Sequence, residues 1–95
     1  MRRVELAPRA RLDLEDIALF GIHTFGYDQA EAYQDGLVRQ FGTLAEFPRI
    51  GLELEDRKGV HRFGYGSHVI LCSFDADSLV IRHVLHGRMD VLRYM

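Results

Sequence analysis

Three apolar segments separated by short turns occupy the second half of this sequence. Residues 60–65 and 68–75 flank the dipeptide Gly66-Ser67, and a third segment runs from Ser78 to His86. Short segments rich in β-branched and other apolar residues are typical of buried or half-buried strands. A two-residue connection that contains glycine is typical of a tight hairpin. The pattern therefore predicts a three-stranded antiparallel meander.

Two amphipathic helices precede these strands. Pro8 suits the first turn of a helix, where a backbone N–H is not needed, and Gly26 suits its C-terminal end. Asp28 and Glu31 form a capping-box pair that predicts the start of a second helix, which ends before Pro48. Because the connection is short, the two helices are expected to form an antiparallel hairpin. Their apolar stripes are Ala10, Leu14, Ile17, Ala18, Gly21 and Phe25 in the first helix, and Ala30, Tyr33, Leu37, Phe41 and Leu44 in the second.

The predicted fold class is α+β. It consists of an N-terminal strand over residues 2–6, the antiparallel helical hairpin, the three-stranded antiparallel meander and a short C-terminal helix or tail. Residues 52–59 are charged and are expected to be irregular. Ninety-five residues suffice for one domain, spanning residues 1–95.

Composition restricts the class of protein further. No apolar run approaches the ~20 residues of a membrane-spanning helix, so no membrane association is expected. The single cysteine, Cys72, excludes an intrachain disulfide and a cysteine-only metal site. Its apolar neighbours predict a small buried side chain. This cysteine usage suits a reducing cytoplasm, where we expect the protein to act.

Charge is distributed unevenly along the chain. Residues 1–56 carry six arginines against eleven acidic residues, a formal balance of −5, whereas residues 57–95 carry six cations against three acidic residues, a balance of +3. The second part is therefore expected to present a positive surface that attracts an acidic partner. With a pI near 6.2, the chain lacks the bulk positive charge of nucleic-acid-binding domains, and we expect no direct sequence-specific nucleic-acid binding.

Both faces of the predicted sheet are partly apolar. Strict alternation places Leu79, Ile81 and Leu85 on one face of the last strand, and Val80 and Val84 on the other. One helical hairpin covers a single face, so the other face is expected to be an exposed apolar patch of the kind that marks an interaction site. The alternative is that residues 91–95 fold back over that face.

The histidines near the C-terminus do not form a metal-binding pattern. His83 and His86 are three residues apart on a predicted strand, which directs their side chains to opposite faces. No paired cysteine or histidine motif accompanies them. The sequence also lacks a Gly-x-Ser-x-Gly elbow and a phosphate-binding glycine loop. We therefore expect no metal and no cofactor.

Metal-free RNA cleavage is the catalytic alternative. That chemistry needs cations that stabilise a phosphorane and a group that moves a proton. Arg62, His68, Arg88 and Tyr94 would supply these groups if they converged on one sheet face. The non-catalytic alternative is that the two arginines pair with acidic residues of a protein partner, His68 lies at a hairpin and Tyr94 packs.

Four motifs resemble the ParE branch of the ParE/RelE toxin superfamily. They are Leu6-Ala-Pro-Arg-Ala10, Asp13-Leu-Glu-Asp-Ile17, Leu44-Ala-Glu-Phe-Pro-Arg-Ile-Gly51 and Val84-Leu-His-Gly-Arg-Met-Asp90, in the family's order over nearly the whole chain. The resemblance implies a small bacterial toxin of a toxin–antitoxin operon, with a helical hairpin packed on an antiparallel sheet. Ala7 stands where the family commonly has serine or threonine, so a side-chain helix cap of roughly 1 kcal/mol is missing.

The resemblance also bears on the target. RelE-like members cleave messenger RNA with lysines, arginines and a C-terminal tyrosine, but Lys58 is the only lysine here. This smaller number of cationic residues resembles ParE members. Those bind DNA gyrase without a known active site and are neutralised by a ParD-like antitoxin. A gyrase-inhibiting toxin with no catalytic residues is therefore expected. The alternatives are a RelE-like ribonuclease and a non-toxic remnant that acts only in antitoxin-dependent operon repression.

Two sets of contact residues follow from this interpretation. Gyrase is expected to contact the end of the last strand and the tail, through His86, Arg88, Asp90, Leu92 and Tyr94. The antitoxin, whose tail is expected to bring acidic and apolar residues, would contact the helical hairpin and the sheet. Its predicted contacts are Leu19, Phe20, Tyr27, Arg62, Val80 and Val84.

Overall fold

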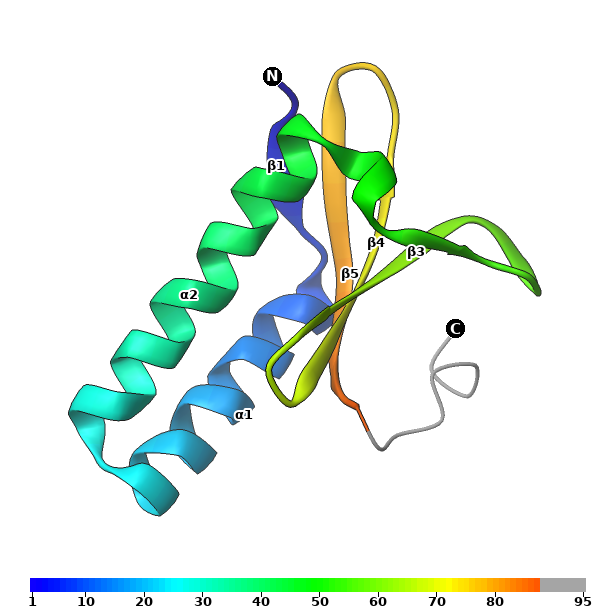
Figure 1. The fold of residues 1–95 in the computed structure, drawn as a ribbon. Helices are drawn as coiled ribbons and strands as arrows, with labels where there is room; N and C mark the ends of the chain where they lie inside the picture. The colour runs from blue at the N-terminus through cyan, green and yellow to red at the C-terminus, as the bar shows by residue number, and fades with distance from the viewer. Residues whose placement is uncertain (88–95) are drawn as a thin grey trace.

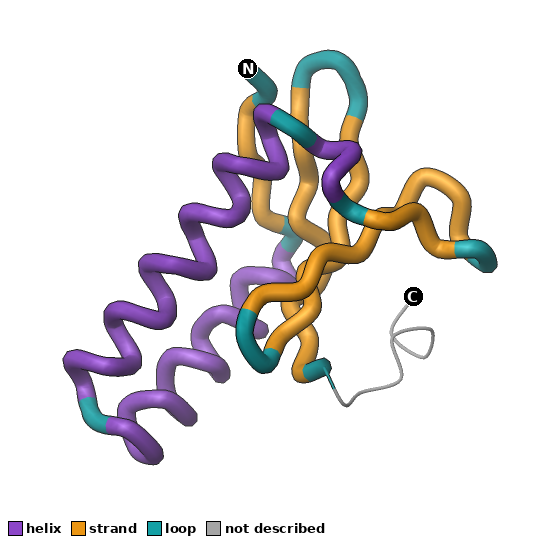
Figure 2. The backbone as a smooth tube through the Cα atoms, viewed as in Figure 1, coloured by secondary structure: helices purple, strands orange, loops and turns teal. Residues whose placement is uncertain are grey.

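The structure is a computed structural model that describes residues 1–87. Strand β1 (Arg3–Leu6) leads into helices α1 (Pro8–Phe25) and α2 (Tyr27–Glu46), which form an antiparallel hairpin (Figures 1 and 2). A short 3-10 helix η1 (Pro48–Ile50) is followed by strands β2 (Leu52–Leu54), β3 (Arg57–Tyr65), β4 (His68–Phe74) and β5 (Ser78–His86). The predicted α+β class and the order of strand, helical hairpin and antiparallel meander are confirmed. The predicted C-terminal helix or tail lies outside the described residues.

The five strands form one sheet in the order β1-β5-β4-β3-β2. Strand β1 pairs in parallel with β5, and the other neighbours are antiparallel. The prediction that residues 52–59 are irregular is wrong, because Leu52 and Glu53 in strand β2 pair with β3. The Glu53 carboxylate also accepts the backbone N–H of Gly59 at 2.7 Å, which holds the turn between the two strands. This hydrogen bond therefore adds a side-chain contact between β3 and the three-residue strand β2.

The helical hairpin covers one face of the sheet and buries the main core between them (Figure 1). The α2 stripe is confirmed as part of this core, with Leu37 and Leu44 fully buried. Strands β4 and β5 contribute side chains from the opposite side, among them Ile70, Cys72, Leu79, Ile81 and Val84. The predicted burial of Cys72 is thus confirmed, and burial raises the pKa of its thiol to about 11. No helix in the described part of the chain is long and apolar enough to cross a membrane.

The predicted capping box of α2 is wrong. The helix begins at Tyr27 with Gly26 as its N-cap, and no side chain caps it. Gly26 has φ 88°, a conformation that favours glycine, and its N–H also closes the end of α1 on Ile22. One glycine therefore ends the first helix and starts the second. Asp28 lies in the first turn of α2, where its charge still complements the helix dipole.

A bulge in β5 overturns the predicted alternation of its side chains. Leu71 pairs with His83 while Cys72 pairs with Ile81, so Arg82 is an extra residue without a counterpart in β4. After the bulge the faces exchange. Val84 joins the main core beside the helices, and Leu85 faces the opposite side.

That opposite face is not the exposed apolar patch that the sequence predicted. Its apolar side chains are buried and form a second cluster, which consists of Leu54, Val60, Val69, Leu71 and Leu85. Val80, the other residue assigned to an exposed face, is half-buried. The exposed apolar surface lies instead on the helices. The hairpin extends past the sheet at its connection (Figure 1), and Leu19, Phe20, Phe25 and Tyr27 are exposed there.

Candidate protein-binding groove

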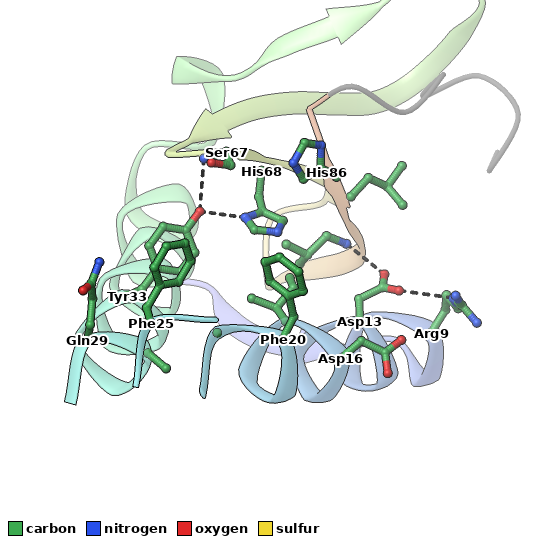
Figure 3. A pocket seen from close by; sticks show the side chains of 15 residues that line it. Arg9, Asp13, Asp16, Phe20, Phe25, Gln29, Tyr33, Ser67, His68 and His86 are labelled. Atoms are coloured by element: carbon green, nitrogen blue, oxygen red, sulfur yellow. Dashed lines mark hydrogen bonds and ion pairs between the residues drawn. The ribbon is translucent and has the colours of Figure 1, made fainter. Parts of the chain in front are cut away.

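A groove of ≈ 660 Å³ opens between the helical hairpin and the adjoining ends of β4 and β5 (Figure 3). One wall comes from α1 and α2, the other from the β3–β4 turn and the end of β5. The groove therefore exists because the hairpin is longer than the sheet face that it covers. Its lining residues are Arg9, Asp13, Asp16, Ile17, Phe20, Gly21, Phe25, Gln29, Ala30, Tyr33, Ser67, His68, Val84, Leu85 and His86.

The part of the helical wall around Phe20 and Phe25 is apolar. The Phe20 and Phe25 rings meet edge-to-face with centroids 6.5 Å apart, and Figure 3 shows both rings beside the groove. A Cβ atom placed on Gly21 would lie 3.1 Å from the Cβ of Ala30, so a small residue lets the two helices approach closely. These exposed aromatic side chains on rigid helices are the kind of anchor that protein partners bind.

A hydrogen-bond network around Tyr33 forms the polar end of the groove (Figure 3). The Tyr33 hydroxyl donates to the carbonyl of Tyr65 at 3.1 Å and accepts the N–H of Ser67 at 3.2 Å. It also lies 2.7 Å from Nδ1 of His68. Because the single hydroxyl proton goes to the carbonyl, we assign the Nδ1 proton to His68, which leaves Nε2 as an acceptor. Burial raises the pKa of Tyr33, in keeping with a protonated hydroxyl.

This network explains a strict requirement at the β3–β4 turn. Gly66 has φ 55°, and a Cβ atom there would lie 2.6 Å from the Tyr33 hydroxyl oxygen. The sequence identified the turn, but it gave no signal that a tyrosine of the second helix closes over it. Tyr33 was expected only as an apolar stripe residue.

The two histidines at this end lie close together. The rings of His68 and His86 meet edge-to-face, with an angle of 75° between their planes and centroids 5.7 Å apart. Burial, and then the charge of His86, lower the pKa of His68, so His68 is neutral at pH 7. Among residues 1–87, no three histidine, cysteine or carboxylate side chains gather into a set that could hold a metal ion. What the site offers is an apolar wall next to the hydrogen-bonding groups of Tyr33 and His68.

Asp13 lies at the other end of the groove and has a structural role that the sequence did not reveal. Strand β1 ends at Leu6, so the edge of β5 beyond Ile81 has no parallel neighbour to bond with. The buried Asp13 carboxylate takes that place and accepts the N–H of Val84 at 3.0 Å. It also pairs with Nε of Arg9 at 3.2 Å. Asp13 thus joins α1 to the sheet.

The structure does not bring Arg62 and His68 together. Arg62 alternates with Val60 on the side of β3 that carries the second cluster. His68 alternates with Ile70 on the helix side of β4, where it contacts Tyr33. The ribonuclease alternative required its candidate residues to converge on one sheet face, and Arg62 and His68 do not meet that condition. The other two candidates, Arg88 and Tyr94, lie outside the described residues.

The predicted contact residues occupy different places. Leu19, Phe20 and Tyr27 are exposed at the hairpin, and Arg62 is exposed on the other side of the sheet. Val84 is only 3% exposed, because the β5 bulge turns it into the main core, and it contributes only this small surface to the lining of the groove. His86 is exposed at the end of β5. The remaining predicted gyrase contacts, Arg88, Asp90, Leu92 and Tyr94, lie outside the described residues.

Comparison with known proteins agrees with this architecture. Residues 4–91 match the family model described as ParE toxin of type II toxin-antitoxin system, parDE. A curated relative, Toxin ParE1 of Caulobacter vibrioides, is 32% identical over 96 residues, which cover 100% of this chain and 99% of that protein.

Two solved structures share the fold. One comes from a chromosomal ParDE toxin–antitoxin system of P. aeruginosa, with a TM-score of 0.76 and 16% identity. The other comes from the toxin-antitoxin complex RelBE2 of Mycobacterium tuberculosis, with a TM-score of 0.68 and 24% identity. Each alignment covers 90% of this chain and 96% of the other. At these identities the two similarities establish the fold alone.

Proposed function

Because this chain belongs to the ParE toxin family of type II toxin–antitoxin systems, we propose that it inhibits DNA gyrase by protein–protein contact and is neutralised by a ParD-like antitoxin. Both partners would meet it in the bacterial cytoplasm. The protein would need no cofactor, since binding alone would arrest the target.

The separation of Arg62 from His68 is the observation that favours contact over RNA cleavage. Cleavage requires a cation and a proton-transfer group on the same phosphate. Here the two side chains lie on opposite faces of the sheet, with the strand backbone between them. His68 is in addition held by Tyr33 and is neutral at pH 7, so it supplies no positive charge to a phosphorane.

The exposed hairpin supports the antitoxin contact. Leu19, Phe20 and Tyr27 present apolar surface next to the groove, and burying such side chains stabilises a complex. The antitoxin would cover these three residues and extend toward Arg62 and Val80 on the sheet. The two similar structures come from a toxin–antitoxin system and a toxin–antitoxin complex, which fits this assignment.

For the target, the proposed contact is the end of β5, through His86, and the residues that follow it. Arg88→Ala and a deletion of residues 92–95 should each reduce toxicity. If both variants remain as toxic as the wild type, the target contact lies elsewhere.

Inducible expression in bacteria, with two readouts, tests the proposed function. Gyrase inhibition predicts broken chromosomal DNA and induction of the SOS response, with intact messenger RNA in primer-extension maps. Co-expression of the cognate antitoxin should restore growth. Codon-phased cuts in messenger RNA without DNA breaks would instead identify a ribonuclease. Normal growth without either lesion would leave the non-toxic remnant.

A further inference from the structure

The outward face of α1 carries leucines where a helix covered on one side would carry only polar residues. Leu12 is 50% exposed and Leu19 is 59% exposed. Seven residues separate them, so they lie on the same side of the helix, two turns apart. Ala10 and Leu14, which are buried against the core, lie on the opposite side. The helix is therefore apolar on two sides, and the outer one is not occupied by the chain's described residues.

Acidic residues lie between these leucines. Glu15 and Asp16 are three and four residues from both Leu12 and Leu19, which places them on the same face. Both are exposed, and neither forms an ion pair within residues 1–87. Their carboxylates are thus available to a partner.

The acidic character extends over the part of the hairpin between Arg11 and Arg39. From residue 12 to residue 38 the chain has six acidic residues and no lysine or arginine. One of them, Asp13, is buried in its contact with Val84, and the other five are exposed. At the hairpin connection, a hydrogen bond and the charge of Glu31 raise the pKa of Tyr27. An acidic segment would be repelled by this surface.

We propose that the outward face of α1 binds an amphipathic helix whose contacting polar residues are lysine or arginine, and that the antitoxin supplies this helix. The leucine pair would receive apolar side chains, and Glu15 and Asp16 would pair with the cations between them. The identity of the partner, though not the chemistry of the surface, rests on the proposed function. The antitoxin segment on the hairpin would therefore be basic, whereas the sequence alone suggested an acidic one.

A second copy of this chain does not fit the same face. Antiparallel pairing of two α1 helices along it would place Glu15 opposite Asp16 of the other copy, and parallel pairing would place each acid beside its own counterpart. Either arrangement brings like charges together between two apolar contacts, which opposes association.

Two labelled synthetic peptides of about 18 residues test the chemistry of the surface. They share one leucine spacing and differ in carrying lysine or glutamate on the polar face. Fluorescence anisotropy with the full chain should show binding of the lysine peptide, weakened by salt. The double variant E15K/D16K should lower its affinity about tenfold. The matched control E55K/D56K changes the net charge equally at the β2–β3 turn and should leave affinity within about twofold.

Three results would overturn the proposal. Equal binding of the glutamate peptide would show that the face does not select basic partners. An equal loss of affinity for the lysine peptide in both double variants would show only an effect of net charge. Dimers in sedimentation that disappear with Leu19→Ser would make a second copy the occupant. Circular dichroism checks that each variant is folded.

The cognate antitoxin tests the identity of the partner separately. If it neutralises the wild type but also neutralises E15K/D16K equally well, another protein binds this face. If it fails to neutralise the wild type, the proposed function fails, while the peptide result still decides the chemistry of the surface.

Discussion

Replacing Asp13 by alanine should destabilise this fold by about 2–3 kcal/mol. The Asp13 carboxylate is buried and accepts the N–H of Val84, which β1 is too short to reach. Removing an ionised acceptor from a buried donor costs about 1.5–3 kcal/mol. The ion pair with Arg9 adds little, because the Arg9 side chain is half-exposed to solvent.

Asp13→Asn is the matched control. Its side-chain carbonyl keeps an acceptor of the same size at the same place, so the free energy of unfolding should fall by about 1 kcal/mol or less. Urea unfolding followed by far-ultraviolet circular dichroism measures both variants. For a domain of this length, the alanine variant should lose roughly 10–20 °C in melting temperature.

Two outcomes would refute this reasoning about Asp13. An alanine variant within about 0.5 kcal/mol of the wild type would mean that the Val84 N–H finds another acceptor at no cost. An asparagine variant as unstable as the alanine variant would mean that the negative charge matters, and not the hydrogen bond to β5.

Three further predictions concern the β3–β4 turn and the start of α1. Gly66→Ala should cost about 2–4 kcal/mol, because it combines a positive φ with a clash at the Tyr33 hydroxyl, and a loss below about 1 kcal/mol in urea unfolding would contradict the stated geometry. The pKa of His68 is lowered in the folded state, so the unfolded chain binds the proton more readily and stability should fall as the pH drops below about 6.5. His68→Gln should flatten that part of the pH–stability curve, and an unchanged slope would assign the effect to other groups. Ala7→Ser should raise stability by about 0.5–1 kcal/mol, since residue 7 has the extended backbone of a helix N-cap but no capping side chain; no gain in melting temperature would exclude a cap there.

The parts of the fold that the sequence predicts well are those set by local patterns. The helical hairpin follows from the spacing of the apolar residues and from Gly26, and the meander follows from its turns. Strand β2 escaped prediction because three residues carry almost no periodic signal, and its pairing depends on the distant β3. The parallel pairing of β1 with β5 is likewise a contact between the two ends of the described chain.

The errors at the candidate site have a common physical cause. One extra residue, Arg82, exchanges the faces of β5 and moves Val84 from a predicted contact surface into the core. Sequence alternation cannot reveal a bulge, because the unpaired residue is defined by the partner strand. In the same way, His68 was identified as a candidate, but its partner Tyr33 lies on a helix 35 residues away in sequence.

The groove depends on a feature that the spacing of apolar residues does not predict. The predicted apolar stripe of α1 includes Phe25, yet this side chain is exposed because the helices continue past the sheet. Helix length relative to strand length is a property of the assembled fold. The exposed end of an otherwise regular stripe is what creates the groove.

The proposed binding of this protein to DNA gyrase can be measured with purified components. The most direct test incubates the purified chain with gyrase, supercoiled plasmid and ATP, and then adds detergent and protease to reveal trapped cleavage. If the chain binds gyrase, linear plasmid should increase with the amount of the chain and disappear when the cognate antitoxin is present. Plasmid that gyrase processes normally, together with cleavage of RNA by the same preparation, would contradict the proposed binding.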